Sequence, residues 1–231
     1  MNKKIVVGIE GPVGSGKTSI CRRLLQKVEG TVLVNGGNIY RAIVFAILKS
    51  GITIEELESK ADNINIKEMM DNLEVTIDFE EQETIMKIKD KKISEEDLQS
   101  PEVSMAVSKI SGSAKNKDLF LFARNLIDEL KEKYNVIVAG RSLMIIYPNL
   151  DYHLFITASI DERVRRKCIQ YNVDVNSEEG KKIRENVITR DKLQEKSGYY
   201  KIYDNTIVLD LTHTKSVEES TEYVLEKINL I

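Results

Sequence analysis

The segment that most constrains this chain is residues 11–18, which read Gly-Pro-Val-Gly-Ser-Gly-Lys-Thr and directly follow the apolar run Ile5–Ile9. This is the pattern G-x-x-x-x-G-K-[ST], which requires a buried strand before it and a helix after it. The stretch Ser19–Val28 is helix-prone. Glycines let the loop curl so that backbone N–H groups point inward, and the helix N-terminus adds the positive end of its dipole. The sequence therefore predicts a strand–loop–helix unit that cradles a phosphate.

A nucleoside triphosphate is the ligand that such a cradle predicts. Lys17 would reach the β- and γ-phosphates, and the Thr18 hydroxyl would hold Mg²⁺. The alternative is a glycine-rich turn that ends in Lys-Thr by chance. The expected ATP-binding residues are Gly11, Pro12, Val13, Gly14, Ser15, Gly16, Lys17, Thr18 and Ser19. The motif predicts that a nucleotide binds, but not what the protein does with it.

Composition excludes several classes of protein. The chain has 231 residues, 42% hydrophobic and 31% charged, which is typical of a soluble globular protein with one core and insertions or with two small domains. Its net charge of −3 gives no general attraction to nucleic acid or to an anionic membrane. No apolar run is long enough to span a membrane, and the N-terminal one is too short for a signal peptide.

The few cysteines and histidines indicate no metal or nucleophile site. Cys21 and Cys168 form neither a disulfide framework nor a metal site, so we expect both to pack in the core. His153 and His213 lack the partner pattern of a catalytic histidine, so we expect structural or surface positions for them. Together with the composition, this predicts a cytoplasmic protein in a reducing environment.

Apolar β-rich runs alternate with helical patterns, which favours a parallel sheet wrapped by helices. The run Val136–Val138 lacks polar alternation, as expected for a strand buried on both faces. The sequence thus predicts an α/β P-loop fold of three layers with a central parallel five-stranded sheet. The expected strands are Lys4–Glu10, Thr31–Asn35, Asn135–Ala139, Tyr152–Thr157 and Thr206–Leu211, and the expected helices are Ser19–Val28, Ile39–Ser50, Asp118–Tyr134, Ile160–Gln170 and Val217–Ile228.

Between about residue 52 and residue 101 the alternation of strand and helix stops. Val75–Phe79 and Thr84–Ile88 alternate polar and apolar residues and are separated by four acidic or amide residues. This predicts an antiparallel hairpin with one solvent-exposed face. We therefore expect residues 52–111 to form an inserted subdomain within a core domain of residues 1–51 and 112–231.

The stretch Tyr171–Tyr203 is polar and highly charged, without a strand pattern. Charge pattern alone admits a solvated helical excursion from the core. The functional alternative is a mobile lid of residues 167–203, whose arginines close over phosphates. Arg163 and Arg166 lie on the helix that leads into this segment, and the dipeptide Arg190–Asp191 lies within it.

Two further segments combine glycine and arginine. Gly36 and Gly37 follow the second expected strand, and Arg41 lies one turn into the next helix, where it could bind a second phosphate. By itself the glycine pair is more typical of an ordinary turn. Gly140 and Arg141 stand at the end of a buried strand, the edge at which open α/β sheets bind ligands.

Taken together, these segments resemble the cytidylate kinases, a family of P-loop nucleoside monophosphate kinases, over nearly the whole chain. Residues 100–110, Ser-Pro-Glu-Val-Ser-Met-Ala-Val-Ser-Lys-Ile, are similar to the family's TPEVSxxVSxI stretch at the exit of its insert. The run Tyr147–Arg166 and the dipeptide Arg190–Asp191 match as well.

The resemblance implies ATP with Mg²⁺ as the phosphoryl donor and CMP or dCMP as acceptor. It assigns Ser108 to the pyrimidine base, and Lys17 with Arg163 and Arg166 to the transferring phosphoryl group. The monophosphate-binding residues that it implies are Gly36, Gly37, Arg41, Ser108, Lys117, Arg141 and Asp191.

The chain departs from the family where carboxylates are expected. Family members read acid-Gly-Arg-Asp at the strand end, whereas this chain has Ala139 and Ser142 at the two acidic positions. Lys117 stands where an arginine recognises cytosine in the family, so a compact ammonium group replaces a planar guanidinium group. Gly36 replaces a serine or threonine near the sugar. Glu10 is the nearest remaining acid that could assist Mg²⁺.

Three functions are compatible with this sequence. The first is phosphoryl transfer from ATP to a pyrimidine nucleoside monophosphate, and the second is a kinase of the same fold with a shifted acceptor. The third is a nucleotide-binding module with weak or no transfer. The retained set Lys17, Thr18, Arg41, Arg141 and Asp191 favours an enzyme. We expect a monomer that binds ATP and a nucleoside monophosphate, and neither a nucleic acid polymer nor a membrane.

Overall fold

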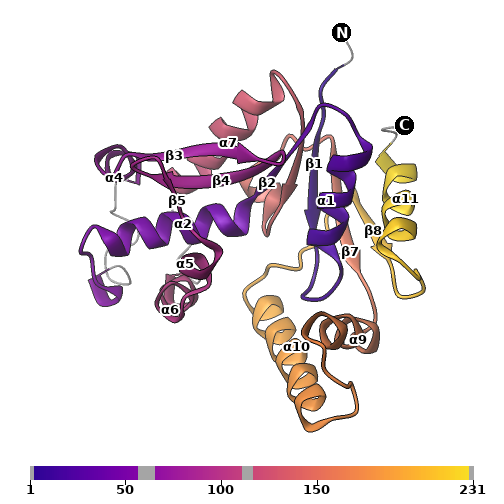
Figure 1. Ribbon diagram of the computed structural model, residues 1–231. Coiled ribbons are helices and arrows are strands. Elements are labelled where there is room, and N and C mark those ends of the chain that lie inside the picture. The colour runs from indigo at the N-terminus through magenta and orange to yellow at the C-terminus, as the bar shows by residue number, and fades with distance from the viewer. Residues whose placement is uncertain (1–2, 57–65, 111–116, 229–231) are drawn as a thin grey trace.

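The computed structural model describes residues 3–56, 66–110 and 117–228, and within them eight strands form one sheet (Figure 1). The strand order is β3-β4-β2-β6-β1-β7-β8, with β5 paired to β4. Its central part is parallel and confirms the predicted fold class. These parallel strands are β1 Val6–Glu10, β2 Thr31–Asn35, β6 Asn135–Ala139, β7 Tyr152–Thr157 and β8 Thr206–Asp210.

Helices cover both faces of the parallel strands, which explains their unbroken apolar runs. On one face α1 (Lys17–Lys27) and α11 (Val217–Ile228) lie side by side (Figure 1). The opposite face is covered by α2 (Gly36–Lys49) and α7 (Lys117–Lys131). Neighbouring residues on a strand point to opposite faces of the sheet and so belong to two different cores. One core contains Val6, Val32, Val34, Val136 and Val138, and the other contains Val7, Ile9, Leu33, Ile137 and Leu154.

The predicted hairpin is present and extends the main sheet. Strands β3 (Val75–Glu80) and β4 (Glu83–Ile88) pair antiparallel around Glu81 and Gln82, whose positive φ values of 47° and 67° suit a two-residue hairpin turn. Strand β4 then pairs in parallel with the edge of β2, and the Leu33 N–H donates to the Gln82 carbonyl at 2.8 Å. The hairpin is thus continuous with the core sheet. The subdomain boundaries at residues 52 and 111 stay a prediction.

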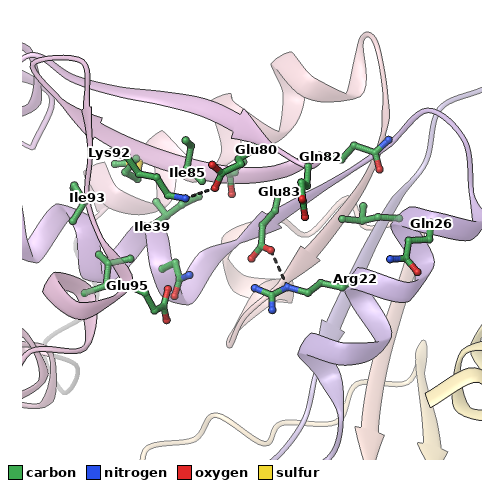
Figure 2. Close-up of a pocket in the computed structure, with 16 residues that line it drawn as sticks. Arg22, Gln26, Ile39, Glu80, Gln82, Glu83, Ile85, Lys92, Ile93 and Glu95 are labelled. Carbon is green, nitrogen blue, oxygen red and sulfur yellow. Dashed lines mark hydrogen bonds and ion pairs between the residues drawn. The ribbon is translucent and has the colours of Figure 1, made fainter. Parts of the chain in front are cut away.

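Side chains attach this hairpin to the phosphate-loop layer. Glu83 accepts a hydrogen bond from Arg22 Nε at 3.0 Å (Figure 2). It also accepts one from Asn35 Nδ2 at 3.2 Å. Asn35 also donates its N–H to Thr84 Oγ1 at 3.2 Å, and its Oδ1 accepts the Asn38 N–H at the start of α2. Because this capping bond satisfies the first turn, α2 begins at Gly36, three residues before the predicted start.

The remaining helices extend from the ends of the sheet. Helices α9 (Ile160–Tyr171) and α10 (Glu178–Lys196) pack together through Val164, Cys168 and Val187 at the carboxyl edge of the strands (Figure 1). The other elements are α4 Ile66–Asn72, β5 Lys91–Lys92, α5 Glu95–Gln99, α6 Pro101–Ile110 and α8 Leu143–Ile146. Within the described ranges no helix is long and apolar enough to cross a membrane.

Candidate active site

The loop between β1 and α1 can be built only with glycine at two of its positions. Gly11 has φ +148°, and a Cβ there would lie 2.0 Å from the Ile156 carbonyl oxygen. Gly14 has φ +77°, and a Cβ there would lie 2.9 Å from the Arg163 carbonyl oxygen. The backbone of the loop therefore packs closely against β7 and α9. Helix α1 begins directly after it, at Lys17, so the positive end of the helix dipole faces the loop.

Lys17 spans the mouth of this loop. Its Nζ donates hydrogen bonds to the carbonyls of Gly11 at 2.6 Å and Pro12 at 2.9 Å. Burial, followed by the positive charge of Arg141, lowers the pKa of Lys17 to about 8. An ammonium group with a lowered pKa beside a second cation favours binding of an anion, because the anion restores the charged form.

Arg163 joins the phosphate loop to two helices. Its side chain is only 5% exposed, and Nη1 donates to the Val13 carbonyl at 3.1 Å. Nε donates to the Ala158 carbonyl at 3.0 Å, and Nη2 pairs with Asp191 at 2.6 Å. The pairing of Arg163 with Asp191 was not expected from the sequence, which assigned both residues to the substrates. Those assignments stay predictions.

Arg166 lies one turn later on α9 and contacts the loop in a similar way. Nη1 donates to the Ser15 carbonyl at 3.0 Å, Nη2 donates to the Leu211 carbonyl at 2.7 Å, and Nε pairs with Glu162 at 2.8 Å. The guanidinium groups of Arg163 and Arg166 therefore both contact backbone carbonyls of the loop. Their expected action on a transferring phosphoryl group is not decided by these contacts.

Three arginines from distant segments, Arg41, Arg141 and Arg190, lie close enough for their charges to act on one another, and Arg141 also acts on Lys17. Burial and then the charge of Arg190 lower the pKa of Arg41, whose Nη1 donates to the Leu98 carbonyl at 3.0 Å. Partial removal from water lowers the pKa of Arg141 in the same way, with Arg190 and Arg41 adding to the effect. The Arg141 guanidinium also lies 5.4 Å from the centre of the Tyr199 ring. A group of neighbouring cations is what a phosphate-binding site requires.

Arg190 was absent from the residues predicted to bind the monophosphate. Successive residues on a helix point about 100° apart. Asp191 on α10 faces Arg163 on α9. Arg190, the residue before it on α10, is therefore directed elsewhere, toward Arg41 and Arg141. The signal in the sequence was the dipeptide itself, but its two side chains could be separated only once the packing of α10 was known.

The start of α2 and the end of β6 also meet at this edge. A Cβ added to Gly36 would lie 3.3 Å from the Ala139 carbonyl oxygen, next to the Gly140–Arg141 segment. The predicted acceptor residues of these two segments are therefore brought together. The side chains of Ser108 and Lys117 lie outside the described part of the structure, although their backbones belong to α6 and α7.

One described pocket lies apart from these residues. A pocket of about 850 Å³ lies between the hairpin turn, α1 and α2, and Figure 2 shows Arg22, Gln26, Ile39 and Glu83 around it. Of the described residues that line it, none belongs to the predicted site. We therefore place the candidate active site at the phosphate loop and the convergent arginines.

Glu10 ends β1, directly before the loop. It is 3% exposed, and its Oε1 accepts the Leu143 N–H at 2.5 Å and lies 3.4 Å from His153 Nε2. Among the described residues, no group of three His, Cys, Asp or Glu side chains could cage a metal ion. Mg²⁺ needs no such cage, because it keeps several waters and is held by one or two protein oxygens together with substrate phosphates.

A glycine-built phosphate loop at the carboxyl edge of a parallel sheet defines the class of P-loop nucleotide-binding proteins. Residues 7–230 match the family model for cytidylate kinase. The chain belongs to the cytidylate kinase family, and its enzyme class is that of the nucleoside monophosphate kinases, which are transferases.

Its similarity to known proteins extends over nearly the whole chain. A cytidylate kinase of Clostridioides difficile is 28% identical, with 98% of this chain and 99% of that protein covered. A cytidylate kinase of Caldicellulosiruptor bescii is also 28% identical, with 97% and 95% covered. The crystal structure of TT1252 from Thermus thermophilus aligns over 98% of this chain and 99% of its own, at 18% identity and a TM-score of 0.47.

Proposed function

We propose that this protein transfers the γ-phosphoryl group of ATP to a pyrimidine nucleoside monophosphate, with CMP and dCMP as the favoured acceptors. The observation that carries the proposal is the grouping of Arg41, Arg141 and Arg190, of which Arg141 also acts on Lys17 of the phosphate loop. In this proposal the loop with Lys17 binds the phosphates of ATP, and the three arginines bind the phosphate of the acceptor. Transfer of a phosphoryl group requires two such sites next to each other. The preference for cytosine is supported by the names of the relatives.

In this proposal Gly11 to Ser19 hold the phosphates of ATP, and Lys17 neutralises charge on the transferring group. Thr18, exposed in the first turn of α1, and Glu10 would hold Mg²⁺ directly or through water. When bound, the metal ion would supply positive charge that neutralises the phosphates of ATP. These oxygens fit a magnesium ion that keeps most of its water shell.

We assign Arg163 a positioning role within this function, because its three hydrogen bonds fix Val13, Ala158 and Asp191. Residues 167–203 would close over both substrates as a lid and exclude water. We also propose that the protein acts as a cytoplasmic monomer.

The experiment that tests this function is an ADP-release assay with ATP and Mg²⁺ against a panel of nucleoside monophosphates. Turnover with CMP or dCMP above all others is the expected result. A preference for UMP, AMP or GMP would instead support a shifted acceptor, for which Ser142 and Lys117 are the motivation. Turnover with none of them would favour the binding module.

Binding of ADP is expected to weaken above about pH 8, approaching tenfold per pH unit, because bound phosphate stabilises the charged form of Lys17. The same lowered pKa disfavours the charged lysine in the folded protein. Stability without ligand should therefore rise as the pH increases from about 8 toward the ordinary pKa of lysine, about 10.4. Titration calorimetry between about pH 7 and about pH 9.5 measures the first effect. In the Lys17→Met variant, ADP affinity should not weaken with pH in this way. If the same weakening persists in this variant, titration of Lys17 is not its cause.

The Arg190→Gln substitution is expected to raise KM for the monophosphate about tenfold, since one charge-assisted contact to phosphate is lost. KM for ATP should change less than about twofold, because Arg190 faces Arg41 and Arg141 rather than the loop. Arg184→Gln is the matched control, because Arg184 is exposed on the same helix and pairs with Asp161. Equal effects of the two substitutions would exclude Arg190 from the acceptor site.

A further inference from the structure

A buried histidine lies beside the strand that leads into the phosphate loop. His153, on β7, is 1% exposed, and its Nε2 lies 3.4 Å from Oε1 of the buried Glu10. His153 is paired with Gly8 of β1 on one side and with Thr206 of β8 on the other. Paired residues share a face of the sheet, and so do residues two apart on a strand. The topology therefore places the imidazole and the Glu10 carboxylate on the same face.

The hydrogen bonds around His153 are compatible with a proton on Nε2. Thr206 Oγ1 accepts the Tyr203 N–H at 2.9 Å and lies 2.8 Å from His153 Nδ1. When the threonine hydroxyl donates to Nδ1, the neutral imidazole carries its proton on Nε2. Nε2 makes no hydrogen bond among the described residues, and Glu10 Oε1 faces it. With this tautomer the imidazole directs an N–H toward Glu10.

Both contacts to the Glu10 carboxylate use the same oxygen. Oε1 accepts the Leu143 N–H at 2.5 Å and faces His153, so Oε2 is left to accept a hydrogen bond from another group. Glu10 immediately precedes Gly11, and its charge reaches the loop. Burial and Arg141 lower the pKa of Lys17, whereas Glu10 acts to raise it.

We infer that His153 is a positioning residue that orients the Glu10 carboxylate at the base of the phosphate loop for the hydration shell of Mg²⁺. The inference rests on the proposed function, in which Glu10 assists the metal ion. The neighbouring strand cannot replace it, because Ala139, paired with Ile9, carries no carboxylate. Outer residues that orient a metal-binding carboxylate commonly decide metal affinity.

The test compares two polar substitutions at His153. In His153→Asn the amide corresponds to Nδ1 and can keep the contact to Thr206, whereas in His153→Gln it reaches the place of Nε2 and can donate to Glu10. The readout is the dissociation constant of ADP with Mg²⁺ and with EDTA, measured by titration calorimetry. We expect the gain in affinity from Mg²⁺ to fall about tenfold in His153→Asn and to stay within about twofold of the original in His153→Gln. His213→Asn, at an exposed histidine, is the control.

A purely structural role for His153 gives a different result. It predicts that ADP affinity falls equally with and without Mg²⁺, or that both variants only lower the melting temperature, and either outcome would overturn the inference. A double-mutant cycle adds a second criterion. In the Glu10→Gln background, His153→Asn should cause no further loss of the magnesium effect, because it acts through Glu10. If the two substitutions instead reduce the magnesium effect independently, so that their fold-changes multiply in the double variant, the inference would also be overturned.

These dissociation constants are measured without an acceptor. A failure to phosphorylate any monophosphate would contradict the proposed function, yet the effect of Mg²⁺ on ADP binding would still test His153. Conversely, normal turnover of CMP with an unchanged magnesium effect in His153→Asn would leave the proposed function intact and remove the role of His153.

Discussion

Replacement of Lys17 by alanine is expected to lower kcat with ATP and CMP by about 10³-fold, with little change in the fold. The ammonium group lies across the loop mouth, bonded to the carbonyls of Gly11 and Pro12 and influenced by the charge of Arg141. In phosphoryl transfer most of the catalysis comes from positioning and from neutralising charge on the transferring group. Loss of this cation therefore acts mainly on the transition state and less on substrate binding.

The measurement is a steady-state assay of kcat and of both KM values, together with a thermal melt. The matched control is Lys27→Ala, at the other end of α1, where the lysine forms ion pairs with Glu218 and Glu222. This control should keep kcat within about twofold of the original, because exposed ion pairs contribute little. A Lys17→Ala protein that melts normally and turns over at a near-normal rate would exclude the phosphate-loop mechanism.

Replacement of Arg163 by methionine is expected to lower the free energy of unfolding by about 3 kcal/mol. The guanidinium group is 5% exposed and makes hydrogen bonds to Val13, Ala158 and Asp191. Methionine fills much of the space but leaves two backbone carbonyls and a carboxylate without their donor. Because these groups join the loop, α9 and α10, activity should fall together with stability.

Urea denaturation at neutral pH measures this effect. Arg165→Met is the matched control on the same helix, since Arg165 is half exposed and pairs only with Glu162 among the described contacts. It should cost less than about 1 kcal/mol. A second test is the combination of Arg163→Met with Asp191→Asn, which should cost less than the sum of the two single changes. Equal unfolding midpoints for Arg163→Met and Arg165→Met would contradict the structural role of Arg163.

Local signals in the sequence were sufficient for much of the fold. The glycine spacing of residues 11–18 predicted the loop, because a Cβ at Gly11 or Gly14 would collide with the neighbouring backbone. The unbroken apolar runs predicted the five parallel strands. Four of them are buried on both faces, whereas the edge strand β8 is partly exposed, with Val208 50% exposed. The alternation in Val75–Phe79 and Thr84–Ile88 predicted the hairpin and its pairing. Each of these features is determined by residues close together in the chain.

The candidate site could be predicted only in part. The sequence identified Lys17, Arg41 and Arg141, because glycine or a strand end marks each segment. It did not separate Arg190 from Asp191, and it assigned His153 no role beside Glu10. It predicted the hairpin as an insert but not the pairing of that hairpin with the central sheet, in which Glu83 is paired with Leu33.

By itself, then, the sequence determined which segments form strands and helices and where a phosphate loop must lie. Only the tertiary structure decided which polar and charged side chains face one another: Arg163 with Asp191, Arg190 with Arg41 and Arg141, and His153 with Glu10. The physical reason is that backbone preference and apolar periodicity act within one element. Contacts between charges instead depend on how elements far apart in the chain pack, and short-range patterns do not contain that information.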